Sequence, residues 1–411
     1  MKVLHITYSS KGGAGIAARR LHLALTENGV SSAYISTDLT IGFDNKPIED
    51  DFFVYKKLTI FSRIIRKIKF LFFLLKEQNI ANKIRLFFIE NDFEILSSTF
   101  SKYKIENHPL FIEADIINLH WISGIIDYTT FFKKCKKPIV WTLHDMNPLL
   151  GVFHYENDMK KASEELLEIN NEVLKIYKRS IHNIKKAIVV TPSQWLLNES
   201  LNYSLLNKFQ HKHISNTIDI NTFKIFNKKE LRVKYNINNK RFVLLFVSES
   251  IDNYRKGFDI LLEAISNVKD IELTVLAIGN GEVHIKQKNI NVIELGKITS
   301  QEKIIEVYNL ADVFLLPSRE DNLPNVILES YSCGLPAISF NIGGVKEHVL
   351  NNITGINAGQ IASQMLTEAI IKMHNQINNY SSEAIRNYAK ENFSFGNQSS
   401  KYIEVYKSLL Y

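Results

Sequence analysis

The stretch that decides the fold reads Val313-Phe314-Leu315-Leu316-Pro317-Ser318-Arg319-Glu320-Asp321-Asn322-Leu323-Pro324-Asn325-Val326-Ile327-Leu328-Glu329-Ser330-Tyr331-Ser332-Cys333-Gly334. The apolar run 313–316 predicts a buried strand, 317–322 a loop, and 324–333 a helix with proline at its start and glycine just past its end. The N-terminus of a helix presents unpaired backbone N–H groups and a positive dipole potential. We therefore expect this loop to bind an anion, most often a phosphate.

Two carboxylates flank the predicted anion site. Glu329 lies about 7.5 Å along the helix from Pro324, and helical side chains lean back toward the N-terminus, so it can reach a ribose whose phosphates sit at the helix end. Asp321 stands eight residues earlier, in the loop, where it would face whatever is attached beyond the phosphates. This arrangement predicts a nucleotide-sugar site.

The segment resembles the carboxylate-x7-carboxylate signature of the retaining group 1 glycosyltransferases, also called family 4, which have the GT-B fold. The resemblance implies that Asp321 contacts the donor sugar and Glu329 the nucleotide ribose. The family usually has Glu at the first position, so Asp321 is a departure. Glu320 beside it is an alternative first carboxylate, but it would break the spacing.

Length and composition fit two globular α/β domains. The chain has 411 residues, and its formal charge of +7 favours acidic partners, although no nucleic-acid-binding module is recognisable. The two cysteines, Cys135 and Cys333, form no disulfide framework. The N-terminus enters a strand at once, and no apolar run approaches the roughly 20 residues of a membrane-spanning helix. These features predict a cytoplasmic protein.

A glycine-rich loop follows the first predicted strand, 2–8, and leads into a helix that ends near Gly29. Its residues 13–18 satisfy the pattern G-x-G-x-x-A, with Asp38 about 20 residues further on, as in dinucleotide-binding folds. An NAD(P)-dependent oxidoreductase is therefore the alternative function. The resemblance to the glycosyltransferases instead implies that Gly13 and Gly15 close over the donor phosphates.

A basic and apolar segment covers residues 56–85. Apolar residues at 61, 64, 65, 68, 71, 72 and 75 follow the spacing of an amphipathic helix, with Lys and Arg on the other face. One interpretation is a helix packed on its own domain with a solvated basic face. The other is a helix that lies on an anionic membrane surface.

Histidines follow two predicted strands of the first half. His120 and Trp121 come after strand 114–119, and His144 and Asp145 come after strand 138–143. Because functional groups gather at the carboxyl ends of parallel strands, we expect them in one cleft. The resemblance places His120 near the reacting sugar and implies that Trp121, His144 and Asp145 contact the acceptor. Metal binding by the histidines and Asp145 is possible from ligand type, but the resemblance implies no metal.

The second half restarts the α/β pattern at 242–247. Arg255-Lys256-Gly257 is similar to the family's basic pair, whose lysine neutralises the donor diphosphate as it leaves. Where the family often has Gly-Arg, this chain has Glu249-Ser250, so one phosphate-binding arginine is missing or replaced by Arg255. A further glycine-rich turn at 343–344 is expected to lead into a helix. The donor contacts implied are Gly13, Gly15, Arg255, Lys256, Gly279, Asn322, Leu323, Asn325 and Glu329.

Together these observations predict a GT-B glycosyltransferase with two Rossmann-like, doubly wound domains facing across a cleft. The expected parts are an acceptor domain, 1–222, a nucleotide-sugar domain, 223–393, and a C-terminal helix, 394–411, that crosses back to the first domain. We expect transfer with retention from a UDP- or GDP-linked sugar to a saccharide or lipid-linked saccharide, with no cofactor and no nucleic acid. Bacterial surface polysaccharide or glycolipid assembly is the expected role, and a non-catalytic nucleotide-binding scaffold is a further alternative.

Overall fold

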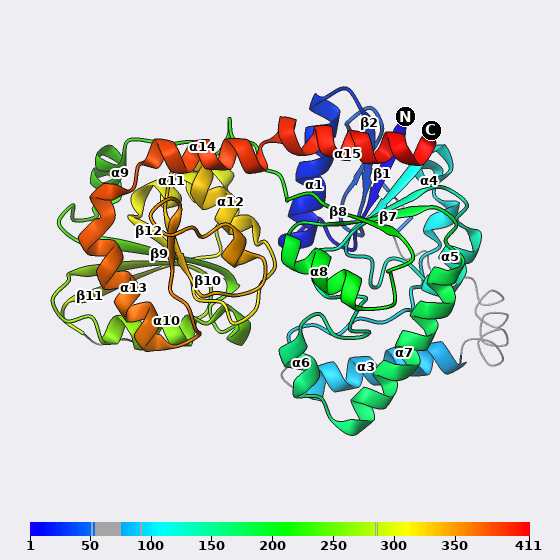
Figure 1. Cartoon of the computed structure of the whole chain (residues 1–411), viewed down its shortest axis with the longest axis horizontal. Coiled ribbons are helices and arrows are strands. Elements are labelled where there is room, and N and C mark those ends of the chain that lie inside the picture. The colour runs from blue at the N-terminus through cyan, green and yellow to red at the C-terminus, as the bar shows by residue number, and fades with distance from the viewer. Residues whose placement is uncertain (51, 54–74, 91–92, 284, 286) are drawn as a thin grey trace. The chain divides into compact units, whose positions relative to one another are not determined.

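The computed structural model describes residues 1–50, 52–53, 75–90, 93–283, 285 and 287–411. These residues form two compact units (Figure 1). Unit 1 comprises residues 1–192, 196–214 and 399–411, and unit 2 comprises residues 193–195 and 215–398. The change from unit 1 to unit 2 thus falls a few residues before the predicted boundary after residue 222.

Unit 1 is built on a sheet of eight strands in the order β4-β3-β2-β1-β5-β6-β7-β8. The strands are β1 (Lys2–Ile6), β2 (Ser31–Ile35), β3 (Thr40–Ile41), β4 (Pro47–Ile48), β5 (Ile116–Leu119), β6 (Ile139–Thr142), β7 (Ala187–Thr191) and β8 (Gln210–His213). All neighbours pair in parallel except β2 with β3 and β3 with β4. Those two antiparallel additions at one edge were not predicted, because each two-residue strand is too short to show a pattern.

Helices cover both faces of this sheet. They are α1 (Gly12–Glu27), α3 (Leu75–Glu90), α4 (Pro109–Glu113), α5 (Tyr128–Lys134), α6 (Glu156–Lys160), α7 (Glu164–His182), α8 (Gln194–Asn202) and α15 (Phe395–Leu410). Side chains of α1 and α15 pack on one face with Val140 of β6. The next residue, Trp141, points to the other face and stacks on Phe132 of α5, as the two-residue period of a strand requires.

The last helix, α15, completes the core of unit 1. Figure 1 draws it in red beside β1, so the two chain termini both lie in this unit. Tyr402, Val405, Tyr406 and Leu409 join the same apolar cluster as Val3. Two buried hydrogen bonds tie it to the sheet, from the Asn118 amide to the Tyr406 hydroxyl (2.7 Å) and between the hydroxyls of Thr142 and Tyr402 (3.2 Å).

Unit 2 is a six-stranded, fully parallel sheet in the order β11-β10-β9-β12-β13-β14. Its strands are β9 (Phe242–Ser250), β10 (Leu273–Asn280), β11 (Ile290–Gly296), β12 (Val313–Leu316), β13 (Ala337–Ser339) and β14 (Gly355–Asn357). Its α-helices are α9 (Lys228–Lys234), α10 (Phe258–Ser266), α11 (Gln301–Leu310), α12 (Asn325–Ser332), α13 (Ser363–Gln376) and α14 (Ser382–Phe393). One continuous apolar core joins them.

Two expectations differ in detail from the structure. Pro324 is the N-cap residue of α12 rather than its first residue, and the helix ends at Ser332. The turn at Gly343 and Gly344 leads only into the three-residue 3-10 helix η3 (Val345–Glu347), which the sequence pattern cannot distinguish from a longer helix. Cys135 and Cys333 are both free and buried.

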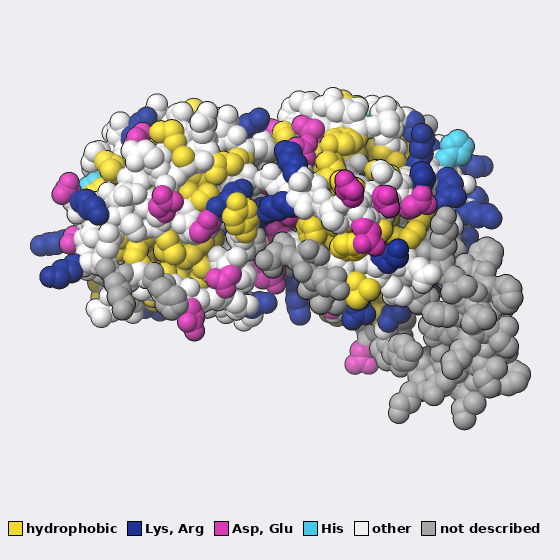
Figure 2. All heavy atoms as spheres, turned by 90° about the horizontal axis from the view of Figure 1, so that it is seen from below, with side chains coloured by type: hydrophobic (Ala, Val, Ile, Leu, Met, Phe, Trp, Pro, Cys, Tyr) yellow, Lys and Arg dark blue, Asp and Glu magenta, His cyan; other side chains and the backbone are white. Residues whose placement is uncertain are grey.

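The basic segment 56–85 falls mostly outside the described residues, which resume at α3. In the described part, Ile80 and Ile84 are buried, Lys83 and Arg85 are exposed, and α3 packs against α7. Over the part of the chain that the structure describes, no helix combines the length and the hydropathy needed to cross a membrane. Figure 2 shows basic side chains of the described residues scattered among acidic and apolar ones on one face.

Candidate functional site

The candidate donor site of unit 2 lies where the strand order reverses. β9 is followed along the chain by β10 and β11 on one side and by β12 on its other side. Ligands of doubly wound sheets bind at the carboxyl ends of the strands next to such a switch point. Here the 3-10 helix η2 (Tyr254–Lys256) follows β9, and the loop 317–322 follows β12. The fold therefore brings the predicted basic pair and the predicted acids together.

Asp321 is the centre of this group. Its carboxylate lies 2.6 Å from Lys256 Nζ and 3.5 Å from an Arg255 guanidinium nitrogen, and it accepts a hydrogen bond from Ser318 Oγ at 3.3 Å. Burial raises the pKa of Asp321, but the charges of Lys256 and Arg255 outweigh it and hold the pKa below its ordinary value. Asp321 is therefore an ionised carboxylate between two cations.

Glu320 has a different place from Asp321. Its backbone carbonyl accepts a hydrogen bond from Arg255 Nη1 at 3.0 Å, whereas the carboxylate that both cations approach is that of Asp321. Arg255 reaches this group although Ser250 stands where the family often has arginine. The geometry is that expected if Arg255 replaces the missing residue.

Two glycines allow the loop to pack this tightly. Gly257 has φ +70°, and a Cβ there would lie 2.0 Å from the Pro317 carbonyl oxygen. A Cβ on Gly343, which has φ +40°, would lie 1.9 Å from the Asp321 carbonyl oxygen. Only glycine combines such backbone angles with so close an approach.

Glu329 lies on α12, the helix whose N-terminus was predicted to bind phosphate. It is 8% exposed, and the Tyr308 hydroxyl of α11 donates a hydrogen bond to its Oε2 at 2.9 Å. The N-cap residue of this helix, Pro324, has no side-chain acceptor, so it makes no capping hydrogen bond to the N–H groups of the first turn. The sequence did not identify Tyr308 because its hydroxyl meets Glu329 only in the folded chain.

A clamp that was not predicted joins the two segments of the donor site. Arg319 binds both carboxylate oxygens of Asp259, at 2.8 and 2.5 Å, and its guanidinium carbon lies 3.7 Å from the centre of the Tyr254 ring. The backbone N–H of Arg319 also donates to the Arg255 carbonyl oxygen at 2.7 Å. These contacts fix the loop after β12 against η2, so they position Lys256 relative to Asp321.

The other predicted donor residues have structural partners within unit 2. Gly279, on β10, lies against the Ser248 carbonyl, which a Cβ would approach to 2.9 Å. The Leu323 carbonyl accepts a hydrogen bond from Asn216 at 3.0 Å, and Asn322 is 2% exposed.

The candidate site of unit 1 lies at its own switch point, where β1 separates β2 from β5. His120 directly follows β5, and His144 follows β6. His120 Nδ1 lies 3.0 Å from His144 Nε2, and His120 Nε2 lies 3.0 Å from Nδ1 of His5, a residue that was not predicted. His5 lies near the end of β1, and that position becomes informative only once the structure shows that β1 pairs with β5.

These three histidines, with His22 behind them, are neutral near pH 7. Burial lowers the pKa of His144 and of His22 to about 4. Burial, together with the neighbouring imidazoles, holds the pKa values of His5 and His120 well below 6.5. His120 is 4% exposed and uses both ring nitrogens in the row, whereas His144 is half-buried. The member of the row nearest the surface is thus His144.

Trp121 and Asp145 are also brought together in unit 1, through a residue that was not predicted. Asp145 Oδ2 lies 2.7 Å from His154 Nδ1, and the Trp121 and His154 rings are 5.6 Å apart between centroids. Ser97 Oγ lies 2.6 Å from the other nitrogen of His154. His154 thus anchors two of the three residues that were expected to contact the acceptor, Trp121 and Asp145.

The glycine-rich loop differs from a dinucleotide site in the use of Asp38. Its carboxylate accepts hydrogen bonds from the Ser10 N–H at 2.7 Å and from the hydroxyls of Ser10 and Ser36. Asp38 is therefore engaged in holding the loop. Gly15 is required by packing, since a Cβ would lie 2.1 Å from the Ser9 carbonyl oxygen, whereas a Cβ on Gly13 would meet no atom within 4 Å.

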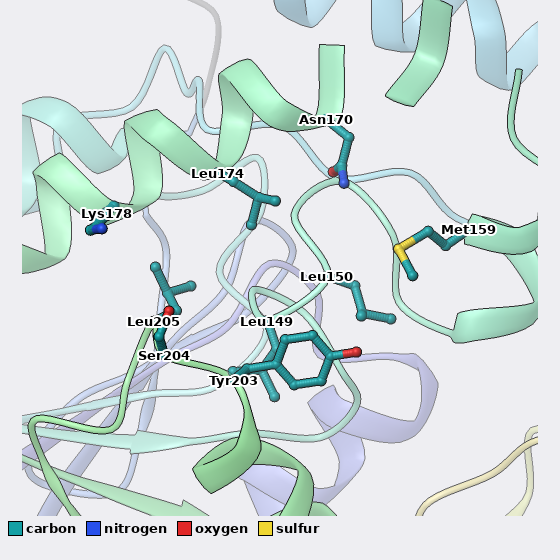
Figure 3. A pocket seen from close by; sticks show the side chains of 9 residues that line it. All are labelled: Leu149, Leu150, Met159, Asn170, Leu174, Lys178, Tyr203, Ser204 and Leu205. Carbon is teal, nitrogen blue, oxygen red and sulfur yellow. The ribbon is translucent and has the colours of Figure 1, made fainter. Parts of the chain in front are cut away.

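A separate hollow of about 250 Å³ lies in unit 1 beside α7 (Figure 3). It contains none of the predicted site residues. Most of its lining is apolar, and the residues are Leu149, Leu150, Met159, Asn170, Leu174, Lys178, Tyr203, Ser204 and Leu205. Among the residues that the structure describes, no group of three or more His, Cys, Asp and Glu side chains is arranged to hold a metal ion.

Comparison with known proteins finds similarity to glycosyltransferases, and the family match lies in unit 2. Residues 241–376 match the family model of the group 1 glycosyl transferases. The chain is 25% identical to glycogen synthase of Thermodesulfovibrio yellowstonii over 348 residues, which cover 73% of this chain and 69% of that protein. It is 30% identical over 174 residues to an uncharacterized glycosyltransferase of Methanocaldococcus jannaschii, covering 40% of this chain and about half, 48%, of that protein.

Solved structures show the same fold at low sequence identity. Sucrose-phosphate synthase from Thermosynechococcus elongatus superimposes with a TM-score of 0.69 at 16% identity, covering 100% of this chain and 98% of that one. Anabaena HepE, solved in complex with UDP-glucose, superimposes with a TM-score of 0.63 at 16% identity, covering 99% and 100%. The two-sheet architecture and the solved structures show that the chain has the GT-B fold, and its residues 241–376 are similar to the group 1 glycosyl transferases.

Proposed function

We propose that this glycosyltransferase moves a sugar from a nucleoside diphosphate sugar to a hydroxyl acceptor with retention of configuration. The observation that carries the proposal is the group of Lys256, Arg255 and Asp321 beside the N-terminus of α12. Two cations and one carboxylate leave a net positive charge. This charge would stabilise the negative charge that develops on the diphosphate as it leaves the sugar. Glu329 stands further along the same helix, where a ribose would lie.

The donor is proposed to be a UDP- or GDP-linked sugar. HepE, a structural neighbour, has been solved in complex with UDP-glucose and with UDP. In the proposed reaction the diphosphate leaves from the face that the acceptor hydroxyl attacks. The bond from the anomeric carbon to the phosphate oxygen breaks, the bond to the acceptor oxygen forms, and the hydroxyl proton passes to the leaving phosphate. No protein nucleophile is needed, and the protein contributes positioning and charge stabilisation.

The test compares nucleotides and then nucleotide sugars. UDP or GDP should raise the melting temperature of the full chain, because a ligand of the folded state stabilises it, and NAD should not. A panel of nucleotide sugars is then screened for donor hydrolysis, and the anomeric configuration of the product is read by proton NMR. Stabilisation by NAD alone would favour the oxidoreductase, and nucleotide binding without turnover of any donor would favour a scaffold.

We further propose that the acceptor is a saccharide or a lipid-linked saccharide used in bacterial surface polysaccharide or glycolipid assembly, at the inner face of the plasma membrane. The net charge of +7 and the exposed Lys83 and Arg85 of α3 support contact with an anionic surface. Salt-sensitive co-sedimentation with anionic but not neutral vesicles is expected. Absence of binding to anionic vesicles at low salt would remove the membrane from the proposal.

A further inference from the structure

The three histidines of unit 1 follow the order of the strands that carry them. β1, β5 and β6 are neighbours in the sheet, and His5, His120 and His144 lie at or just after their carboxyl ends. The rings overlap as a stack, with centroids 5.3 Å apart in both pairs and planes inclined by 30° and 26°. Each pair is joined by a nitrogen-to-nitrogen distance of 3.0 Å.

Such a row links the tautomers of its members. A neutral imidazole carries one proton, so each hydrogen bond between two rings must use an N–H of one and the lone pair of the other. If His5 donates through Nδ1, then His120 must donate through Nδ1 to His144, and His144 carries its own proton on Nδ1. If the bonds run the other way, every ring carries its proton on Nε2. Only these two sets satisfy both hydrogen bonds.

The inner end of the row favours the first set. His5 is completely buried, and its Nε2 finds no hydrogen-bond partner among the described residues. The second set would place a proton on that nitrogen and leave a buried N–H unpaired, which is rarer in proteins than an unused acceptor. His22, the nearest other imidazole, is bound to Ser32 and Asn45 instead.

We propose that His5 and His120 are positioning residues that fix the tautomer and ring orientation of His144, and that His144 is the member of the row that contacts the acceptor or donor oxygen. This rests on the proposed function for the identity of the substrate. The row itself is a property of unit 1 and can be tested without turnover. In this row His120 acts through His144, because both ring nitrogens of His120 already form hydrogen bonds to the neighbouring histidines.

The first measurement is the nitrogen NMR spectrum of the full chain labelled with ¹⁵N-histidine, with the His144 signals assigned from a His144→Gln variant. The wild type should show His144 protonated on Nδ1. His5→Phe removes the donor to His120 Nε2 and should shift the His144 signals toward a mixture of tautomers. His5→Asn, whose side-chain amide replaces Nδ1, should restore the wild-type pattern.

The second measurement is kinetic and uses the donor found in the nucleotide-sugar screen. His5→Phe should lower kcat by about 10- to 100-fold, as for loss of an outer-shell partner of a functional histidine, while KM for the donor stays within about 2-fold. His5→Asn should recover most of kcat. His22→Phe is the matched control, since it also removes a buried histidine but leaves the row intact.

The outcomes separate the row from the proposed function. Unchanged His144 signals in His5→Phe, or an equal shift in His22→Phe, would overturn the tautomeric link. If the His144 signals shift in His5→Phe but the wild type transfers no sugar, the tautomeric link is supported and the proposed glycosyltransferase function is rejected. An equal loss of kcat in His5→Phe and His5→Asn would show that His5 serves only packing.

Discussion

Lys256 and Asp321 form a partly buried ion pair with Nζ and Oδ2 2.6 Å apart, and Arg255 approaches the other carboxylate oxygen at 3.5 Å. Asp321 thus holds both cations at the end of β12 before any anion arrives. Because Lys256 and Arg255 are already held in place, binding an anion costs less conformational entropy. The excess positive charge of the group remains available to attract that anion.

Replacing Lys256 by Ala should lower turnover about 10²-fold or more, because one donor to the leaving diphosphate is lost. The check is the initial rate with saturating donor. Lys372→Ala, an exposed lysine on α13, is the matched control and should turn over like the wild type. A rate in Lys256→Ala equal to that of the control would exclude Lys256 from the site.

Glu329→Ala should abolish measurable UDP or GDP binding, because the carboxylate is proposed to bind the ribose hydroxyls. Glu263→Ala removes an exposed acid from α10 and serves as the control. Isothermal titration calorimetry measures both. Normal affinity in Glu329→Ala would overturn the ribose assignment.

Tyr308→Phe tests whether Glu329 needs its hydrogen bond of 2.9 Å to the Tyr308 hydroxyl. Without it the carboxylate can rotate, so we expect nucleotide affinity to fall about 10-fold, which corresponds to about 1.4 kcal/mol. Tyr235→Phe removes a similar tyrosine-to-glutamate bond, that to Glu306, and should leave affinity unchanged. Equal affinities for the two variants would show that Tyr308 does not position Glu329.

Gly257→Ala should destabilise the chain and disturb the donor site together. The positive φ alone costs an L-residue about 1–2 kcal/mol, and the added Cβ would also push against the Pro317 carbonyl. Gly359→Ala is the control, because Gly359 has φ +80° with nothing within 4 Å of a Cβ. Thermal unfolding and nucleotide affinity should separate the two variants. If both lose the same stability and neither loses affinity, the contact with Pro317 has no role.

Acid should destabilise unit 1 in a defined window. His22 and His144 take up a proton near pH 6.5 when unfolded but only near pH 4 when folded, so the unfolded chain binds more protons between these values. Stability is therefore complete above pH 6.5 and declines as the pH falls toward 4, by up to about 1.4 kcal/mol per pH unit for each histidine. Urea unfolding between pH 7 and 5 measures the slope, which His22→Gln should reduce. A stability independent of pH over this range would contradict the buried neutral state.

Much of the fold could be predicted because buried parallel strands appear as apolar runs followed by turns, as at 313–316 and 242–247. The grouping of Lys256 with Asp321 was predicted through the family resemblance, and the structure brings the two residues together. The clamp of Arg319 on Asp259 and Tyr254 could not be predicted, because it joins residues some 60 positions apart that show no motif. His5 was missed because an imidazole inside a strand gives no signal until the neighbouring strand is known.

The position of α15 has a consequence for the synthesis of the chain. Residues 399–411 belong to unit 1, although all of residues 215–398 belong to unit 2. During translation, unit 1 therefore lacks Tyr402 and Tyr406 until residues 399–411 have left the ribosome, and the side chains of Asn118 and Thr142 have no tyrosine partner before then. Unit 1 is therefore completed only after unit 2, and a chain without residues 399–411 would have both an incomplete apolar core and a buried Asn118 amide without its tyrosine partner.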